Sequence, residues 1–142
     1  MIDILNLKQY QEIIINDQKY LVLNKVKFIE KSSYWYEYKL QKDSTKDIFH
    51  LNVELSKKAI LYSKVSEDIQ TDAISIMYKN KSYSLYENGT GKTEICYGMS
   101  DYGMHEEVKY YEYVCNTNSN EVISVEIWKS KKEISIGQVV KV

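Results

Sequence analysis

The run Tyr34-Trp35-Tyr36-Glu37-Tyr38-Lys39-Leu40-Gln41 decides the fold class, because the character of its side chains alternates from one residue to the next. A strand directs successive side chains to opposite faces, so Tyr38 and Leu40 share one face. Trp35 and Glu37 then share the other face. This period of two predicts a strand with one buried face and does not fit a helix.

The same alternation continues along most of the chain and is interrupted by short polar links of hairpin size. About a dozen strands are predicted in this way, with 19–23 separate from 25–29 and 82–87 separate from 92–97. Links this short cannot hold the crossover that parallel neighbours need, so we expect antiparallel pairing throughout. The run Gly89-Thr90-Gly91-Lys92-Thr93 lacks the full phosphate-loop pattern, and we predict a hairpin turn there.

The second half of the sequence repeats the order of the first half. Segment 12–20 aligns with 75–83, 36–38 aligns with 111–113, and 51–55 aligns with 123–127. We therefore predict one all-β domain over residues 1–142, built from two antiparallel meanders at about 10–65 and 73–140. Each meander would bury its apolar face against the other, in a pseudo-twofold sandwich or a closed barrel.

Composition narrows the classes of partner. The formal net charge is −1 and every basic residue other than histidine is lysine, so we expect no nucleic-acid partner. The aliphatic runs are too short for membrane insertion, and the first residues do not resemble a signal peptide, which predicts a cytoplasmic protein. The two cysteines and two histidines lack metal-ligand spacing, so we expect no metal and no cofactor.

Each half carries a hairpin face with aromatic rings and two glutamates. If the hairpins pair near Glu37 with Glu54 and near Glu112 with Glu126, each pair of carboxylates approaches within cross-strand distance. Such a pair can act as acid and base or hold a hard cation, whereas a solvated, lysine-neutralised sheet face is the structural alternative. The candidate binding surface comprises Trp35, Glu37, Glu54, Tyr110, Glu112, Glu126 and Trp128.

Several of these residues also have the pattern of a known family. Trp35, Glu37, Tyr38 and Leu40 match a W-x-E-Y-x-L run, supported by Tyr111-Glu112-Tyr113 and by the late Glu126-x-Trp128. In that order they resemble the bacterial domain-of-unknown-function family numbered 4178, from about Leu5 to Val139.

This sequence departs from the family at Asn16-Asp17-Gln18, where a glycine turn is common, and at Phe49-His50-Leu51, where a Trp-Leu pair is common. The resemblance implies a bacterial origin and supplies no catalytic residue, cofactor or ligand.

Two functional hypotheses follow. The favoured one is a non-enzymatic module that binds another protein through the Trp35 face, because no catalytic motif is present. The alternative is a barrel that binds a small molecule or carbohydrate, or an enzyme that uses a pair of glutamates. The alternative requires an enclosed pocket around those glutamates.

Overall fold

The computed structural model describes residues 2–69 and 74–142, and in that part of the chain it contains ten β-strands and no helix. The strands are β1 (Glu12–Ile15), β2 (Gln18–Glu30), β3 (Ser33–Lys42), β4 (Ile48–Val53), β5 (Ala59–Val65), β6 (Ser75–Tyr78), β7 (Lys81–Tyr97), β8 (Glu107–Cys115), β9 (Glu121–Ile127) and β10 (Lys132–Val140). The predicted strand from Ala73 begins at Ser75, and Ala73 itself lies outside the described residues.

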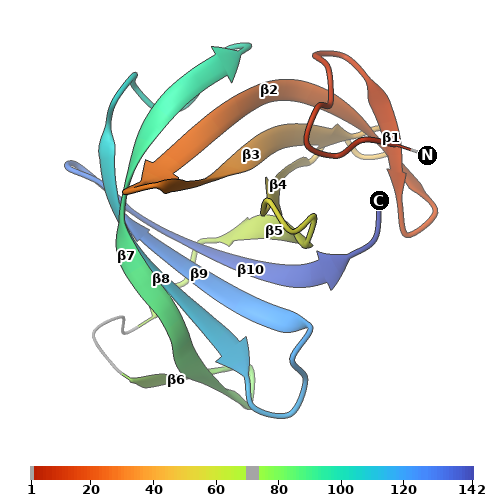
Figure 1. The fold of residues 1–142 in the computed structure, drawn as a ribbon. Coiled ribbons are helices and arrows are strands. Elements are labelled where there is room, and N and C mark those ends of the chain that lie inside the picture. Colours follow the sequence, from red (N-terminus) through yellow and green to blue (C-terminus); the bar gives the residue numbers. More distant parts are fainter. Residues whose placement is uncertain (1, 70–73) are drawn as a thin grey trace.

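The strands form one antiparallel sheet that closes on itself. Their order is β1-β2-β3-β4-β5-β10-β9-β8-β7-β6, and a further pairing joins β2 to β7. Of the described strands, the eight from β2 to β5 and from β7 to β10 therefore form a barrel, which β1 and β6 extend as hairpins (Figure 1). The predicted antiparallel all-β fold is confirmed, and its closure selects the barrel over the sandwich.

The two halves of the chain occupy equivalent places in this order. β1 to β5 run along the sheet from one end and β6 to β10 from the other, meeting at the β5–β10 and β2–β7 seams. Both halves begin with a tight hairpin whose two turn residues have positive φ, at Asn16 (50°) and Asp17 (63°) and at Lys79 (48°) and Asn80 (64°). An origin in sequence duplication stays a prediction.

At the centre of the β5–β10 seam the two halves carry side chains of very different size. Tyr62 lies directly opposite Gly137 in the ladder. A Cβ atom at Gly137 would lie 2.6 Å from the Tyr62 ring, so the glycine leaves the space that this ring occupies.

Two predicted breaks between strands are wrong. β2 is continuous over 18–30 and β7 over 81–97, and each contains an irregularity, at Val22/Asn24 and at Leu85/Glu87. In β2 the bulge shifts the phase of the side-chain alternation at the predicted break, whereas in β7 the predicted break falls on the glycine-containing residues 88–91, after the irregularity. The predicted hairpin turn at Gly89–Thr93 is also wrong, because these residues lie inside β7.

The two faces of the strands have different characters. One face carries an apolar cluster covered by β1 and the N-terminal segment, with Tyr38 and Leu40 fully buried, and a second cluster near β6, with Tyr113 and Val125 fully buried. By alternation, the opposite face of each strand points into the barrel, and this interior face carries Glu37. The fold therefore keeps its main apolar clusters away from the barrel interior and leaves a polar, aromatic interior.

Candidate functional site

Most of the predicted surface residues meet inside the barrel. Trp35, Glu54, Tyr110, Glu112 and Glu126 line one cavity of about 260 Å³. The remaining two lie next to it, since Glu37 borders a smaller space that it shares with Glu126, and Trp128 is buried among aromatic rings. Residues from both halves of the chain thus converge on one interior region.

The cavity is acidic and aromatic. Its wall contains carboxylates and rings from six strands and one turn, and no lysine, arginine or histidine stands among its lining residues in the described part of the chain. The lining residues are Glu30, Ser33, Tyr34, Trp35, Asn52, Glu54, Leu55, Ser56, Tyr62, Glu87, Tyr110, Glu112, Ser124 and Glu126.

The glutamates of the wall differ in how they are bound. Glu30 accepts hydrogen bonds from the Tyr110 hydroxyl at 2.7 Å and from the Thr90 N–H at 2.9 Å. The Tyr110 ring in turn packs edge-on against Trp35, with 5.3 Å between ring centroids. Glu30 is therefore a structural residue that holds one aromatic wall in place.

Glu54, Glu112 and Glu126 are left without a counter-ion. The seven ion pairs of the described residues use other carboxylates, namely Glu12, Asp43, Asp68, Asp101, Glu121 and Glu133. Burying a carboxylate without a positive partner disfavours its charged form. The cavity therefore holds acidic groups that the protein itself does not neutralise by an ion pair.

The environment of these carboxylates raises their pKa values. Burial raises the pKa of Glu112 to about 7, with Glu87 and Glu54 adding to the rise and Lys58 opposing it. Burial also raises the pKa of Glu126 well above its ordinary value, and the charges of Glu37 and Glu133 act in the same direction. Glu126 is half-buried because its side chain borders the cavity.

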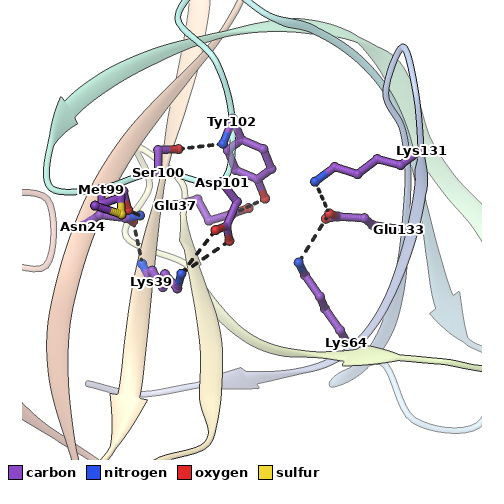
Figure 2. Close-up of polar contacts among 10 residues, drawn as sticks. All are labelled: Asn24, Glu37, Lys39, Lys64, Met99, Ser100, Asp101, Tyr102, Lys131 and Glu133. Carbon is purple, nitrogen blue, oxygen red and sulfur yellow. Dashed lines mark hydrogen bonds and ion pairs between the residues drawn. The ribbon is translucent and has the colours of Figure 1, made fainter.

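A second, smaller space of about 20 Å³ adjoins the cavity around Glu37. The Tyr102 hydroxyl donates a hydrogen bond of 2.9 Å to Glu37 Oε1, and burial raises the pKa of Glu37 (Figure 2). His50 Nε2 is buried here without a hydrogen-bond partner among the described residues. Across this space, Glu133 forms ion pairs with Lys64 at 3.3 Å and Lys131 at 2.9 Å (Figure 2).

Tyr102 fills this part of the interior from the loop 98–106 between β7 and β8. Its ring stacks on Trp128, with 4.3 Å between centroids and 11° between planes, and meets Phe28 edge-on at 5.8 Å. The Trp128 indole N–H finds no hydrogen-bond acceptor in the described part of the chain, although it lies near enough to Glu126 to oppose the rise of that pKa.

Side chains of the barrel hold this loop down. Asn24 Nδ2 donates to the Met99 carbonyl at 2.7 Å, and Lys39 forms an ion pair with Asp101 at 3.3 Å (Figure 2). The Thr93 hydroxyl donates to the Gly103 carbonyl at 2.6 Å. The loop is thus a fixed plug over the Glu37 space.

The register of the hairpins separates the two proposed glutamate pairs. Glu37 lies opposite Asn52, and Glu112 lies opposite Ser124, so Glu54 and Glu126 stand two residues further along their chains. Charge effects cross between the halves, because Glu37 acts on the pKa of Glu126 and Glu54 acts, more weakly than Glu87, on that of Glu112.

Sequence reasoning missed four residues that shape the interior: Glu30, Tyr62, Glu87 and Tyr102. Tyr62 had a usable signal in the sequence, since its strand alternates. In the structure its partner on β4 is His50. Tyr102 had none, because it lies in a loop between strands and reaches its contacts only through the folded chain. In the described residues, no group of three or more histidine, cysteine, aspartate or glutamate side chains is arranged to hold a metal ion.

Comparison with known proteins gives one match. The family model described as a domain of unknown function (DUF4178) matches residues 11–142. No curated protein matches the chain, and no solved structure matches it. Among the described residues, no helix has the length and apolar character needed to cross a membrane.

Proposed function

This chain belongs to the DUF4178 family, and on that premise we propose that its barrel binds a small molecule in the cavity lined by Trp35, Glu54 and Glu112. The observation that carries the proposal is the cavity itself. At about 260 Å³ it is slightly below the range of roughly 300–1,000 Å³ that is usual for ligand pockets, so it suits a compact ligand.

The composition of the wall supports binding. Aromatic rings present large, stiff contact surfaces, and a few polar groups among them fix the orientation of a ligand. Here Trp35, Tyr62 and Tyr110 supply rings, while Asn52 and Ser124 supply neutral hydrogen-bonding groups. This combination favours specific recognition over a simple packing defect.

The position of Trp35 favours this function over the protein partner expected from the sequence. Its ring is half-buried, stacked on Phe28 at 5.5 Å and in contact with Tyr110 at 5.3 Å. A flat protein surface could not cover rings engaged in this way inside a barrel. The protein partner expected at the Trp35 face stays a prediction.

A cavity-blocking variant tests the proposal. Ser56 lies exposed on the turn at the edge of the cavity, so a Ser56→Trp ring should fill the space without disturbing the core. Ser119→Trp places the same ring on the exposed β8–β9 turn and is the matched control. A fragment library that mixes cations, anions and neutral compounds is screened against all three proteins by amide chemical-shift perturbation.

Fragments that shift amides of Trp35, Asn52 and Ser124 in the wild type and in Ser119→Trp, but not in Ser56→Trp, would support the proposal. Overturning it requires that no fragment of any charge perturbs these amides, or that Ser56→Trp binds the same fragments equally well.

A further inference from the structure

We propose that the ligand of this cavity is an organic cation that bears an ammonium or amidinium group. This inference rests on the proposed binding function and adds the chemical class of the ligand. The cavity is one in which the protein supplies negative groups and aromatic rings but no positive group of its own.

The distribution of ion pairs is the first argument. The lysines that form ion pairs do so with other carboxylates, whereas Glu54, Glu112 and Glu126 face the cavity with no ion pair in the described chain. Lys64 acts on Glu126, but its ion pair is with Glu133. Lys58 is near enough to act on Glu112, yet its ammonium lies over the Tyr86 ring at 5.9 Å and outside the lining. A cationic ligand would neutralise these carboxylates and form charge-assisted hydrogen bonds with them.

The aromatic walls are the second argument. A cation near the face of a Trp or Tyr ring is attracted by the ring quadrupole, and more strongly in a partly dry site. The protein already uses such contacts, because Lys25 lies 4.0 Å from the centroid of Tyr36 and Lys27 lies 4.2 Å from that of Tyr34. Rings and carboxylates around one space match an ammonium group on a small organic body.

The adjoining space shows how the barrel accommodates a ring with a donor. There the Tyr102 ring stacks on Trp128, and its hydroxyl donates a hydrogen bond to Glu37. Glu112 follows Tyr111 as Glu37 follows Tyr36, but no side chain of the described residues donates a hydrogen bond to it. A bound ligand would supply that donor.

Isothermal titration calorimetry with three matched probes tests the inference. Tyramine, tyrosol and 4-hydroxyphenylacetate share one ring and differ in carrying an ammonium, a hydroxyl and a carboxylate group. At about pH 8 we expect tyramine to bind at least roughly tenfold more tightly than tyrosol, and the carboxylate not to bind.

Two variants assign the effect to the cavity. Glu112→Gln should weaken tyramine binding by roughly tenfold and leave tyrosol binding unchanged, because only a charged carboxylate distinguishes the two. Glu107→Gln removes an exposed charge from the same strand and is the control. Glu54→Gln, in the turn that follows β4, repeats the test should Glu112→Gln fold poorly.

The pH dependence supplies an independent reading. Tyramine should bind more tightly at about pH 8 than at about pH 6, because Glu112 loses its proton near pH 7. The titratable groups that face Glu112 are Glu87, Glu54 and Lys58, with Glu126 and Tyr62 on the same cavity wall. Tyrosol binding should not follow pH in this range.

The outcomes separate the two proposals. Equal binding of tyramine and tyrosol, unaffected by Glu112→Gln, would overturn the cationic ligand and leave the binding cavity in place. Preference for 4-hydroxyphenylacetate would do the same. Absence of binding by every probe, together with a fragment screen that finds nothing in the cavity, would overturn both.

Discussion

The open cavity around Glu112 and the closed space around Glu37 are two versions of one arrangement. In both, a glutamate flanked by tyrosines on a central strand points into the barrel. The Glu37 space is sealed by Tyr102 and Trp128. Trp128 lies two residues after Glu126, and the residue at the same distance after Glu54, in the β4–β5 turn, is Ser56. The space around Glu37 has a volume of about 20 Å³, and the cavity around Glu112 has a volume of about 260 Å³.

The difference comes from a connection and not from the strands. β2 and β3 are joined by a tight turn at residues 31–32, whereas β7 and β8 are joined by the loop 98–106. Extra loop residues cost little closure entropy and tolerate change. A barrel of this kind can therefore gain or lose an internal site by changing one loop while its sheet stays the same.

The largest expected effect comes from deleting the plug. Tyr102→Ala removes a buried ring and leaves Glu37 without its hydrogen-bond donor, so the free energy of unfolding should fall by about 3–5 kcal/mol. Leu55→Ala removes a largely exposed side chain from the edge of the open cavity and should cost about 1 kcal/mol or less. Urea denaturation followed by tryptophan fluorescence measures both.

Phenol provides the control for this comparison. If the space around Glu37 is shaped for the Tyr102 ring, phenol should restore part of the lost stability to Tyr102→Ala and none to Leu55→Ala. Equal losses of unfolding free energy in the two variants would show that the Tyr102 ring does not distinguish the Glu37 space from the open cavity.

The next effect concerns pH. The pKa of Glu112 rises from 4.5 to about 7 on folding, so the folded state is more stable when this side chain is neutral. The stability linked to this group is complete below about pH 4.5 and is lost as pH rises through about 7. Glu112→Gln should therefore remove a loss of up to about 3 kcal/mol between acid and alkaline pH.

Urea midpoints of the wild type and Glu112→Gln at about pH 5 and pH 8 give this measurement, with Glu107→Gln as control. A wild type whose stability changes with pH no more than that of Glu112→Gln would contradict the buried, uncompensated state of the cavity.

A smaller effect is expected at the start of the plug loop. Gly98 has φ of +78°, and a Cβ atom there would lie 2.4 Å from the Leu23 carbonyl oxygen. Gly98→Ala should therefore lower the free energy of unfolding by about 2 kcal/mol. Gly103→Ala in the same loop meets only the flexible end of Glu106, at 3.3 Å, and should cost about 0.5 kcal/mol or less. Similar losses would remove the special role of Gly98.

The smallest effect is expected at the ion pair that ties the loop to β3. Lys39→Ala breaks the contact with Asp101, which is partly exposed, and should cost about 0.5 kcal/mol. Lys19→Ala breaks the more exposed pair with Glu12 and should cost less. Thermal unfolding at low and high salt separates the two, and a loss above about 2 kcal/mol for Lys39→Ala would indicate that the pair is essential to the plug.

Alternation in the sequence was enough to predict the strands and to place Trp35 and Glu37 on one face. It did not show that this face is enclosed, because enclosure depends on the pairing of β2 with β7, two strands far apart in the chain. Pairing over such a distance leaves no local pattern. The favoured expectation was therefore that this face contacts a protein, with an enclosed pocket only as the alternative, whereas Glu37 is buried.

The parts of the site that escaped prediction lie where local rules end. The bulge in β2 shifts the phase of alternation, and Gly89 and Gly91 inside β7 have the look of turn residues, so both strands appeared broken. Tyr102 lies in a loop, where no side-chain alternation marks buried positions. Its role appears only when Phe28 and Trp128 surround it. Glu30 ends a strand and gains its role from Tyr110 on another strand.

The contact between Tyr62 and Gly137 bears on how such a barrel can arise. The two residues face each other at the meeting point of the halves, and only one of them can bear a large side chain there. A dimer of two identical half-barrels would have to place two tyrosines or two glycines at this point, with a clash in one case and a hole in the other. Joining the halves in one chain permits a large residue on one strand of this seam and a glycine on the other.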